Sequence, residues 1–199
     1  MSKCGILASG MPLEKLTRAR IVQALNLLGE LAEQEGVTLE LCIYGGSALI
    51  LAYGAREGTK DVDVMAKPWN EVERLAKRVA EELNLDEQWL GNGVRLFVSD
   101  QGTFAPLEIQ ELETVARKRL KITRPSASYL LAMKCFAGRP SLPGYQGDIE
   151  DIKFLIRKMG IRSVEEVERH FDRFYPFDAL TPQIRETIEG ILRETKSQL

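Results

Sequence analysis

Residues 39–66 read LELCIYGGSALILAYGAREGTKDVDVMA, and this stretch predicts a strand, a glycine turn, a helix and a second strand. The apolar run Leu39–Tyr44 forms the first strand, and the two glycines after it suit a tight turn that brings the backbone close to another group. The apolar helical stretch Ser47–Ala55 follows, and we call Gly45, Gly46 and Ser47 the glycine turn. Because the first N–H groups of a helix have no partner within it, this turn is suited to bind a phosphate.

Two aspartates follow on the second strand. Asp61 and Asp63, which we call the Asp pair, lie two residues apart, so their carboxylates share one face while Val62 and Val64 share the other. Two carboxylates so close repel each other unless a cation lies between them, and ligand sets made only of oxygen favour Mg²⁺ or Mn²⁺. A phosphate site followed by such a pair indicates chemistry on a nucleoside triphosphate (NTP).

The order of these motifs resembles the nucleotidyltransferase fold, in which a Gly-Ser turn precedes a metal-binding Asp-x-Asp. The resemblance implies that Gly46 and Ser47 hold the triphosphate while the Asp pair binds metal ions that activate the attacking hydroxyl. Arg56 and Thr59 fall where the toxin-like branch of this fold has an Arg-x-x-Thr/Ser pattern before the aspartates. Arg56 then braces the loop or reaches phosphate, unless it is an ordinary surface arginine. The chain departs from the pattern in carrying two glycines before the serine.

A second motif places a lysine within an apolar helix. Lys134 lies in the run Leu130–Phe136, so it must extend to the surface or meet an anion. Beyond the next loop, Asp148 is expected to cap a helix, and Asp151 lies one turn further on the same face. One interpretation is a structural ion pair between the two helices. The other comes from a resemblance to the C-terminal half of AbiEii-type nucleotidyltransferase toxins and their uncharacterised relatives. It implies that Lys134 contacts the triphosphate and that Asp148 or Asp151 completes the site.

A third carboxylate is a further feature that the resemblance implies. Many enzymes of this fold have another acidic residue on a later strand, where it acts as a base or a metal ligand. Glu108 is the best candidate, because Leu107 and Ile109 point to the opposite face of the predicted strand Phe104–Gln110. The alternative is an outward glutamate on a half-exposed strand.

Composition restricts the class of protein. The 199 residues carry a formal net charge of −2 and 44% hydrophobic residues, as expected for a globular protein that stays off the membrane. No apolar run approaches the roughly 20 residues of a membrane span. Three scattered cysteines without a Cys-x-x-Cys motif favour reduced thiols and a cytoplasmic location. The dense basic stretch Arg117–Arg124 is a solvated strand or loop, or it contacts a polyanion such as an RNA backbone.

The pattern as a whole predicts an α/β (α+β) fold with a nucleotidyltransferase-like mixed β-sheet and flanking helices. Residues 1–125 form this core, and residues 126–199 form a helical region that completes the site, with the boundary near Pro125. The expected elements are a helix from Pro12 to Gly36, a helix from Pro68 to Asn84, a strand with a hairpin or bulge within residues 88–99, and helices from Ser126, Asp148, Ser163 and Thr181.

The resulting hypothesis is a Mg²⁺-dependent or Mn²⁺-dependent nucleotidyltransferase that moves a nucleoside monophosphate from an NTP to a hydroxyl acceptor. The resemblance implies tRNA or a protein side chain as acceptor, and a cognate antitoxin as partner of a toxin. The alternative is a non-catalytic, antitoxin-like member of the fold that binds a nucleotide or another protein. A glycosyltransferase that uses Asp-x-Asp is disfavoured, because it needs no phosphate-binding turn a few residues upstream.

Overall fold

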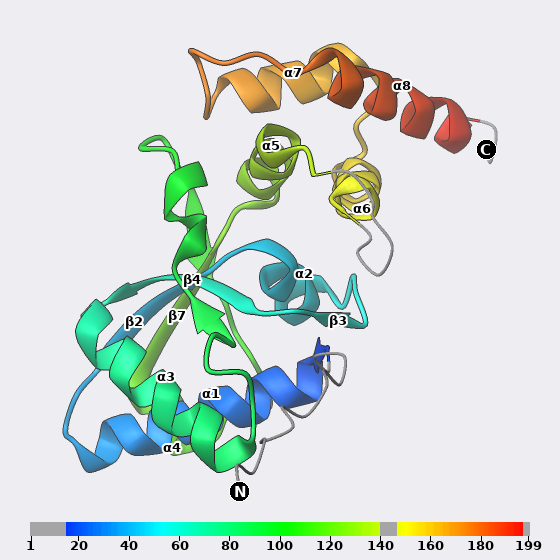
Figure 1. Cartoon of the computed structure of the whole chain (residues 1–199). Helices are drawn as coiled ribbons and strands as arrows, with labels where there is room; N and C mark the ends of the chain where they lie inside the picture. Colours follow the sequence, from blue (N-terminus) through cyan, green and yellow to red (C-terminus); the bar gives the residue numbers. More distant parts are fainter. Residues whose placement is uncertain (1–14, 140–146, 197–199) are drawn as a thin grey trace, which may run out of the picture.

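The computed structural model of the chain describes residues 15–139 and 147–196, and a mixed β-sheet lies at its centre (Figure 1). The strand order is β5-β4-β2-β7-β6, in which β2 runs parallel to β7 and antiparallel to β4. The strands are β2 (Leu39–Ile43), β4 (Val62–Lys67), β5 (Leu90–Gly91), β6 (Phe104–Pro106) and β7 (Leu120–Pro125). Two short strands, β1 (Leu16–Thr17) and β3 (Gly58–Thr59), pair separately. The predicted mixed α/β fold is confirmed.

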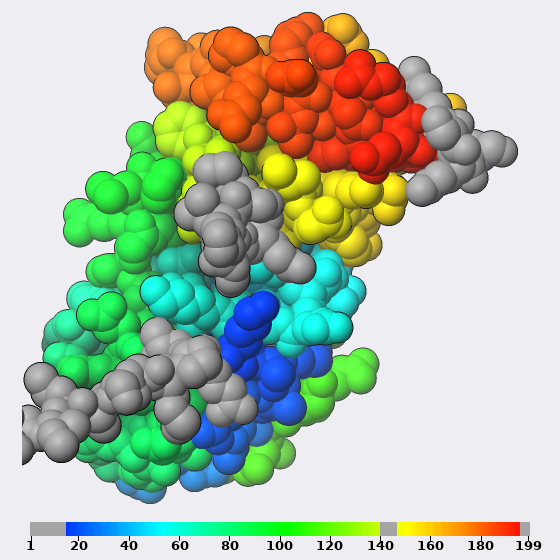
Figure 2. Space-filling model, turned by 45° about the vertical axis from the view of Figure 1, so that its right-hand side comes forward, coloured from blue at the N-terminus to red at the C-terminus, as the bar shows by residue number. Residues whose placement is uncertain are grey.

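The helices form two groups around this sheet. Figure 1 shows α1 (Arg18–Gln34), α3 (Trp69–Leu83) and α4 (Thr114–Arg119) gathered at the bottom of the view. The later helices α5 (Ala127–Ala137), α6 (Ile149–Met159), α7 (Val164–Asp172) and α8 (Pro182–Lys196) gather at the top, and α2 (Gly45–Tyr53) lies between the two groups. In Figure 2 the orange and red surface of α7 and α8 covers one end of the molecule. The predicted C-terminal helical region is therefore present.

Contacts cross the predicted boundary at Pro125. Ser126 Oγ accepts from Tyr129 N at 3.2 Å, which confirms Ser126 as the cap of α5. The hydroxyl of Tyr129 in turn accepts from Ser99 N at 2.6 Å, and the Tyr175 hydroxyl donates to Phe97 O at 2.6 Å. Buried hydroxyls that bond to the backbone fix the helical region against the sheet region.

The first helix begins later than predicted. Pro12 lies outside the described residues, and α1 begins at Arg18 because Thr17 is its N-cap, with Oγ1 accepting from Arg20 N at 3.4 Å. Leu16 and Thr17 instead pair with Thr59 and Gly58. The predicted helix therefore merged a capping residue and a short strand into one apolar pattern.

The predicted hairpin within residues 88–99 is wrong. Only Leu90–Gly91 is a strand there, paired in parallel with β4, and the 3₁₀ helix η1 (Gly93–Phe97) follows it. Trp89 is buried and its Nε1 donates to Ala76 O at 2.9 Å, so its apolar character serves packing against α3. The strand predicted over residues 104–110 is shorter, because β6 ends at Pro106.

The close contact between α1 and α4 depends on Gly29. A Cβ at this position would lie 2.4 Å from Ala116 Cα and 2.6 Å from Ala116 Cβ. We expect Gly29→Ala to lower the free energy of unfolding by about 1–3 kcal/mol, since overpacking outweighs the gain of about 1 kcal/mol in helix propensity. Urea unfolding measures this change.

Gly190→Ala is the matched control, because Gly190 also lies within a helix but has no neighbour within 4 Å of an added Cβ. This control should stabilise the protein by up to about 1 kcal/mol. Equal stabilisation by both substitutions would contradict the close packing of α1 on α4.

Candidate nucleotide and metal site

The glycine turn lies directly against the Asp pair and Arg56. Gly45 has a φ of +60°, and an added Cβ there would lie 3.0 Å from Asp63 Oδ2. An added Cβ at Gly46 would lie 2.8 Å from Arg56 Nη1 and 3.1 Å from Thr59 Oγ1. Gly45 is therefore favoured by its backbone conformation, and a side chain at Gly46 would displace the end of the Arg56 side chain. The double glycine, a departure from the Gly-Ser pattern, has a steric reason in this chain.

The sequence predicts that the helix begins at Ser47, but it begins two residues earlier. α2 begins at Gly45, with Tyr44 as N-cap, and the first intrahelical bond runs from Ala48 N to Tyr44 O at 3.1 Å. The buried Ser47 hydroxyl donates to Tyr44 O at 2.8 Å. The cap makes no side-chain hydrogen bond within the described residues, so the part of this helix start suited to an anion is its backbone N–H groups.

The Asp pair lies beside this helix start. Val62 and Val64 are fully buried and the two aspartates are partly exposed, which confirms the predicted alternation. Tyr44 N donates to Asp63 O at 2.9 Å, so a backbone bond ties the glycine turn to the Asp pair. Burial raises the pKa of Asp63, and the neighbouring charge of Asp61 raises it further. A carboxylate in this position is stabilised by a cation.

Two adjoining pockets meet at Asp63. One, of about 240 Å³, is lined by Gly45, Asp63, Lys134 and Arg139 together with apolar residues of η1 and α5. The other, of about 460 Å³, is lined by Asp61, Asp63 and residues of α3 and the β5 segment, among them Trp69. Gly45, Asp63 and Lys134 thus come from three segments of the chain to line one pocket, whereas Asp61 lines only the larger pocket.

A chain of alternating charges borders the smaller pocket. Lys134 Nζ lies 2.7 Å from Asp148 Oδ1 and 2.8 Å from Asp151 Oδ2. Arg56 Nη1 lies 3.0 Å from Asp151 Oδ2, and Arg139 Nε lies 3.0 Å from Asp148 Oδ2. We call these five residues the charge network. Both aspartates predicted as partners of Lys134 contact it, and Arg56 is part of the network and not a solvent-facing side chain.

Asp148 holds the N-cap position of α6 without capping it. Its side chain makes no cap hydrogen bond, and both of its oxygens accept from Lys134 and Arg139 instead. Burial acts to raise the pKa of Asp148, but the charge of Lys134 and the hydrogen bonds from Arg139 and Lys134 outweigh it and hold the pKa below its usual range. The predicted ion pair between α5 and α6 is present, and it borders the pocket that contains Asp63.

Comparison with known proteins gives no assignment. No model of a protein family matches the chain, and no curated protein or solved structure matches it. None of the helices within residues 15–139 and 147–196 has the length and apolar character to cross a membrane. The functional interpretation therefore depends on the residues and geometry of this chain.

Glu108 is not brought to the Asp pair. It is exposed and lies just beyond β6, next to Leu107, whose N–H bonds to Ile122 O. The register of the sheet places Glu108 near Lys121, which pairs with Glu40 at the start of β2. Asp63 lies beyond the other end of β2. Three strand spacings also separate β6 from β4, roughly 14 Å in all. The prediction that Glu108 supplies a third carboxylate is corrected by this register.

The basic stretch Arg117–Arg124 is largely paired within the protein. It forms the end of α4 and the strand β7, and the helix α4 was not predicted. Lys118 and Arg119 both pair with Glu33, and Lys121 Nζ lies 3.5 Å from Glu40 Oε1. These charges stabilise contacts with α1 and β2, which reduces the positive surface available to RNA.

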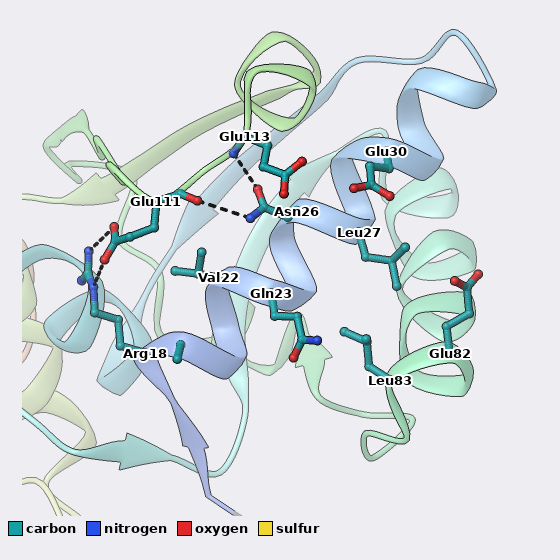
Figure 3. A pocket seen from close by; sticks show the side chains of 11 residues that line it. Arg18, Val22, Gln23, Asn26, Leu27, Glu30, Glu82, Leu83, Glu111 and Glu113 are labelled. Carbon is teal, nitrogen blue, oxygen red and sulfur yellow. Dashed lines mark hydrogen bonds and ion pairs between the residues drawn. The ribbon is translucent and has the colours of Figure 1, made fainter.

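A further pocket carries none of the predicted site residues. It is a groove of about 720 Å³ along α1, shown in Figure 3. Arg18 pairs there with Glu111, and Asn26 bonds to the backbone of Glu111 and Glu113. Its polar side chains thus hold the segment before α4 against α1.

A divalent cation fits the Asp pair when a triphosphate is present. Within the described residues no group of three or more His, Cys, Asp or Glu side chains is placed to hold a metal ion. Mg²⁺ is commonly held by only one or two carboxylates, with phosphate oxygens and water as the other ligands. Two carboxylates beside an anion-binding helix start therefore match a metal that enters with its nucleotide.

Proposed function

We propose that this protein is a divalent-metal-dependent nucleotidyltransferase. It moves a nucleoside monophosphate from an NTP to a hydroxyl acceptor and releases pyrophosphate. The observation that carries the proposal is the pocket that Gly45, Asp63, Lys134 and Arg139 line together. A phosphate-binding helix start, a carboxylate and two cations there provide what phosphoryl transfer needs, which is positioning and charge stabilisation.

Each group has a role in this proposal. The N–H groups at the start of α2 orient the triphosphate, and the two glycines let Asp63 and Arg56 lie close to that helix start. Asp61 and Asp63 hold Mg²⁺ or Mn²⁺, which when bound neutralises phosphate charge and polarises the phosphoryl group. The acceptor hydroxyl gives up its proton to water as its oxygen bonds to the α-phosphorus, and the bond from that phosphorus to the oxygen of the leaving pyrophosphate breaks. The charge network keeps positive groups beside that leaving group.

The larger pocket provides room for the second substrate. It opens on the other side of Asp63 and is lined by Asp61, Trp69 and Glu73 among others. The proposed acceptor is a protein side chain or tRNA. The proposal also includes that the protein is a cytoplasmic toxin whose partner is a cognate antitoxin. Because the basic stretch is largely paired with Glu33 and Glu40, the protein acceptor has more support than tRNA.

A non-catalytic nucleotide-binding protein is the second candidate. It is favoured by the separation of Glu108 from the Asp pair and by the pairing of Lys134 with two carboxylates. Such a protein would bind a triphosphate with metal and would not turn it over.

Label transfer distinguishes the two candidates. The protein is incubated with each α-³²P-labelled NTP and with cellular RNA and protein, in the presence of Mg²⁺ or Mn²⁺ or with EDTA. The transferase requires label on an acceptor with metal and none with EDTA. Triphosphate binding without transfer to any acceptor would favour the non-catalytic protein, and the absence of both would refute the nucleotide site.

A further inference from the structure

Two cations border the smaller pocket, and their surroundings differ. Lys134 Nζ contacts two carboxylates at 2.7 and 2.8 Å, and only 5% of the lysine side chain is exposed. Asp148 and Asp151 are themselves 1% and 3% exposed. Moving the ammonium toward a substrate would take it from both buried carboxylates, which is costly in a buried site. Lys134 is thus held in place.

Arg139 meets the same carboxylate from the solvent side. Its Nε and Nη2 donate to Asp148 at 3.0 and 3.3 Å, and its backbone N–H donates to Asp148 Oδ2 at 3.1 Å. Half of its side chain is exposed, and it lines the pocket together with Gly45 and Asp63. A half-exposed guanidinium that lines this pocket has the planar set of N–H donors that suits a phosphate group.

The geometry points to Arg139, and not Lys134, as the residue that contacts the β- and γ-phosphates of the bound NTP. Lys134 is then a positioning residue, because it fixes Asp148 and Asp148 directs the guanidinium toward the pocket. This assignment rests on the proposed function and specifies which cation binds the leaving pyrophosphate. The sequence singled out the lysine because it interrupts an apolar helix, whereas Arg139 follows the helix-ending Gly138 as an ordinary loop residue.

Binding of inorganic tripolyphosphate tests the assignment without knowledge of the nucleobase. Isothermal titration with Mg²⁺ compares wild type with Arg139→Ala, Arg139→Lys and Arg162→Ala. Arg162 is an exposed arginine before α7 and outside both pockets, so its substitution changes the net charge equally. We expect Arg139→Ala to bind about 10-fold to 100-fold more weakly, and Arg162→Ala to bind as wild type does. Arg139→Lys should recover only part of the affinity, because an ammonium lacks the planar pair of donors.

A structural role for Arg139 would show in a different measurement. The melting temperature of Arg139→Ala should stay within about 4 °C of wild type, since half of the arginine side chain is exposed and the buried Asp148 keeps Lys134 as a charged partner. If Arg139→Ala does not fold, the charge-preserving Arg139→Lys decides, and wild-type affinity in that variant overturns the assignment.

The assignment and the proposed function fail in different ways. Wild-type affinity in a folded Arg139→Ala, with transfer still present in wild type, overturns only the role of Arg139. No binding of tripolyphosphate by wild type with Mg²⁺ or Mn²⁺ overturns both.

Discussion

Asp63→Asn is expected to reduce metal-dependent nucleotidyl transfer by about 100-fold to 1000-fold and to stabilise the fold. The activity falls because an amide oxygen is a weaker ligand for Mg²⁺ than a carboxylate oxygen, and because the neutral amide does not balance the charge of the cation. A single lost electrostatic contact at a reacting centre reduces the rate by a factor of about 10²–10³. The fold gains stability because the substitution removes a partly buried charge beside Asp61. The asparagine has nearly the same shape, so Gly45 keeps its space.

The pH dependence has a defined sign. Burial and Asp61 place the pKa of Asp63 above its ordinary 3.8, so protons compete with metal at higher pH than at an ordinary aspartate. Affinity for Mn²⁺ should therefore rise with pH through that raised pKa. A pKa that is higher in the folded state than in the unfolded state favours folding below the unfolded value, and this advantage disappears as pH rises through the folded value.

Unfolding in urea at two pH values measures the stability change. At pH 7 we expect Asp63→Asn to be more stable than wild type by about 0.5–2 kcal/mol, with a smaller difference at pH 4. Asp178→Asn, which changes an exposed aspartate before α8, is the control and should alter neither metal affinity nor stability. Full transfer activity in Asp63→Asn would remove Asp63 from the metal site.

Lys134→Met is expected to lower the free energy of unfolding by about 3–5 kcal/mol. The substitution keeps the length of the side chain and removes the ammonium that contacts Asp148 and Asp151. Both carboxylates are almost fully buried. Within the charge network, Asp148 then keeps only Arg139 as a charged partner, and Asp151 keeps only Arg56. The loss comes from buried charge that is no longer balanced, more than from the ion pair itself.

Lys153→Met is the matched control, because Lys153 pairs with Glu194 at 2.6 Å near the surface of α6. This control should cost no more than about 1 kcal/mol. Adding Asp148→Asn and Asp151→Asn to Lys134→Met should recover more than about 1 kcal/mol, because these substitutions remove the unbalanced charges. A loss below about 1 kcal/mol in Lys134→Met would mean that the charge network does not hold α5 and α6 together.

Acid should reduce the difference between wild type and Lys134→Met. The charge of Lys134 and the hydrogen bonds to Arg139 overcome burial and lower the pKa of Asp148 in the folded protein. The stability that this provides is present above the ordinary pKa of 3.8 and is lost as pH falls through the lower folded value. Melting curves between pH 7 and pH 3 should converge at the acidic end.

Local patterns in the sequence predicted much of the fold. The alternation of Val62 and Val64 with the two aspartates and the helix start at Ser126 both depend on residues within a few positions of one another. Such short-range preferences act wherever the segment lies in the fold. The prediction failed where a short apolar run packs by single side chains, as at Trp89, because a strand and an irregular segment then look alike.

The sequence by itself determined which chemical groups this protein has available: a glycine turn, an Asp pair, and a lysine in an apolar helix followed by two aspartates. Only the tertiary structure decided that Lys134 lies between Asp148 and Asp151, that Arg56 and Arg139 extend this network, and that Glu108 lies at the far end of the sheet. The reason is physical. Packing decides which side chains of α5 and α6 meet, and strand register decides which residues of β2 and β6 lie beside each residue of β7. Both depend on contacts between segments far apart in the chain.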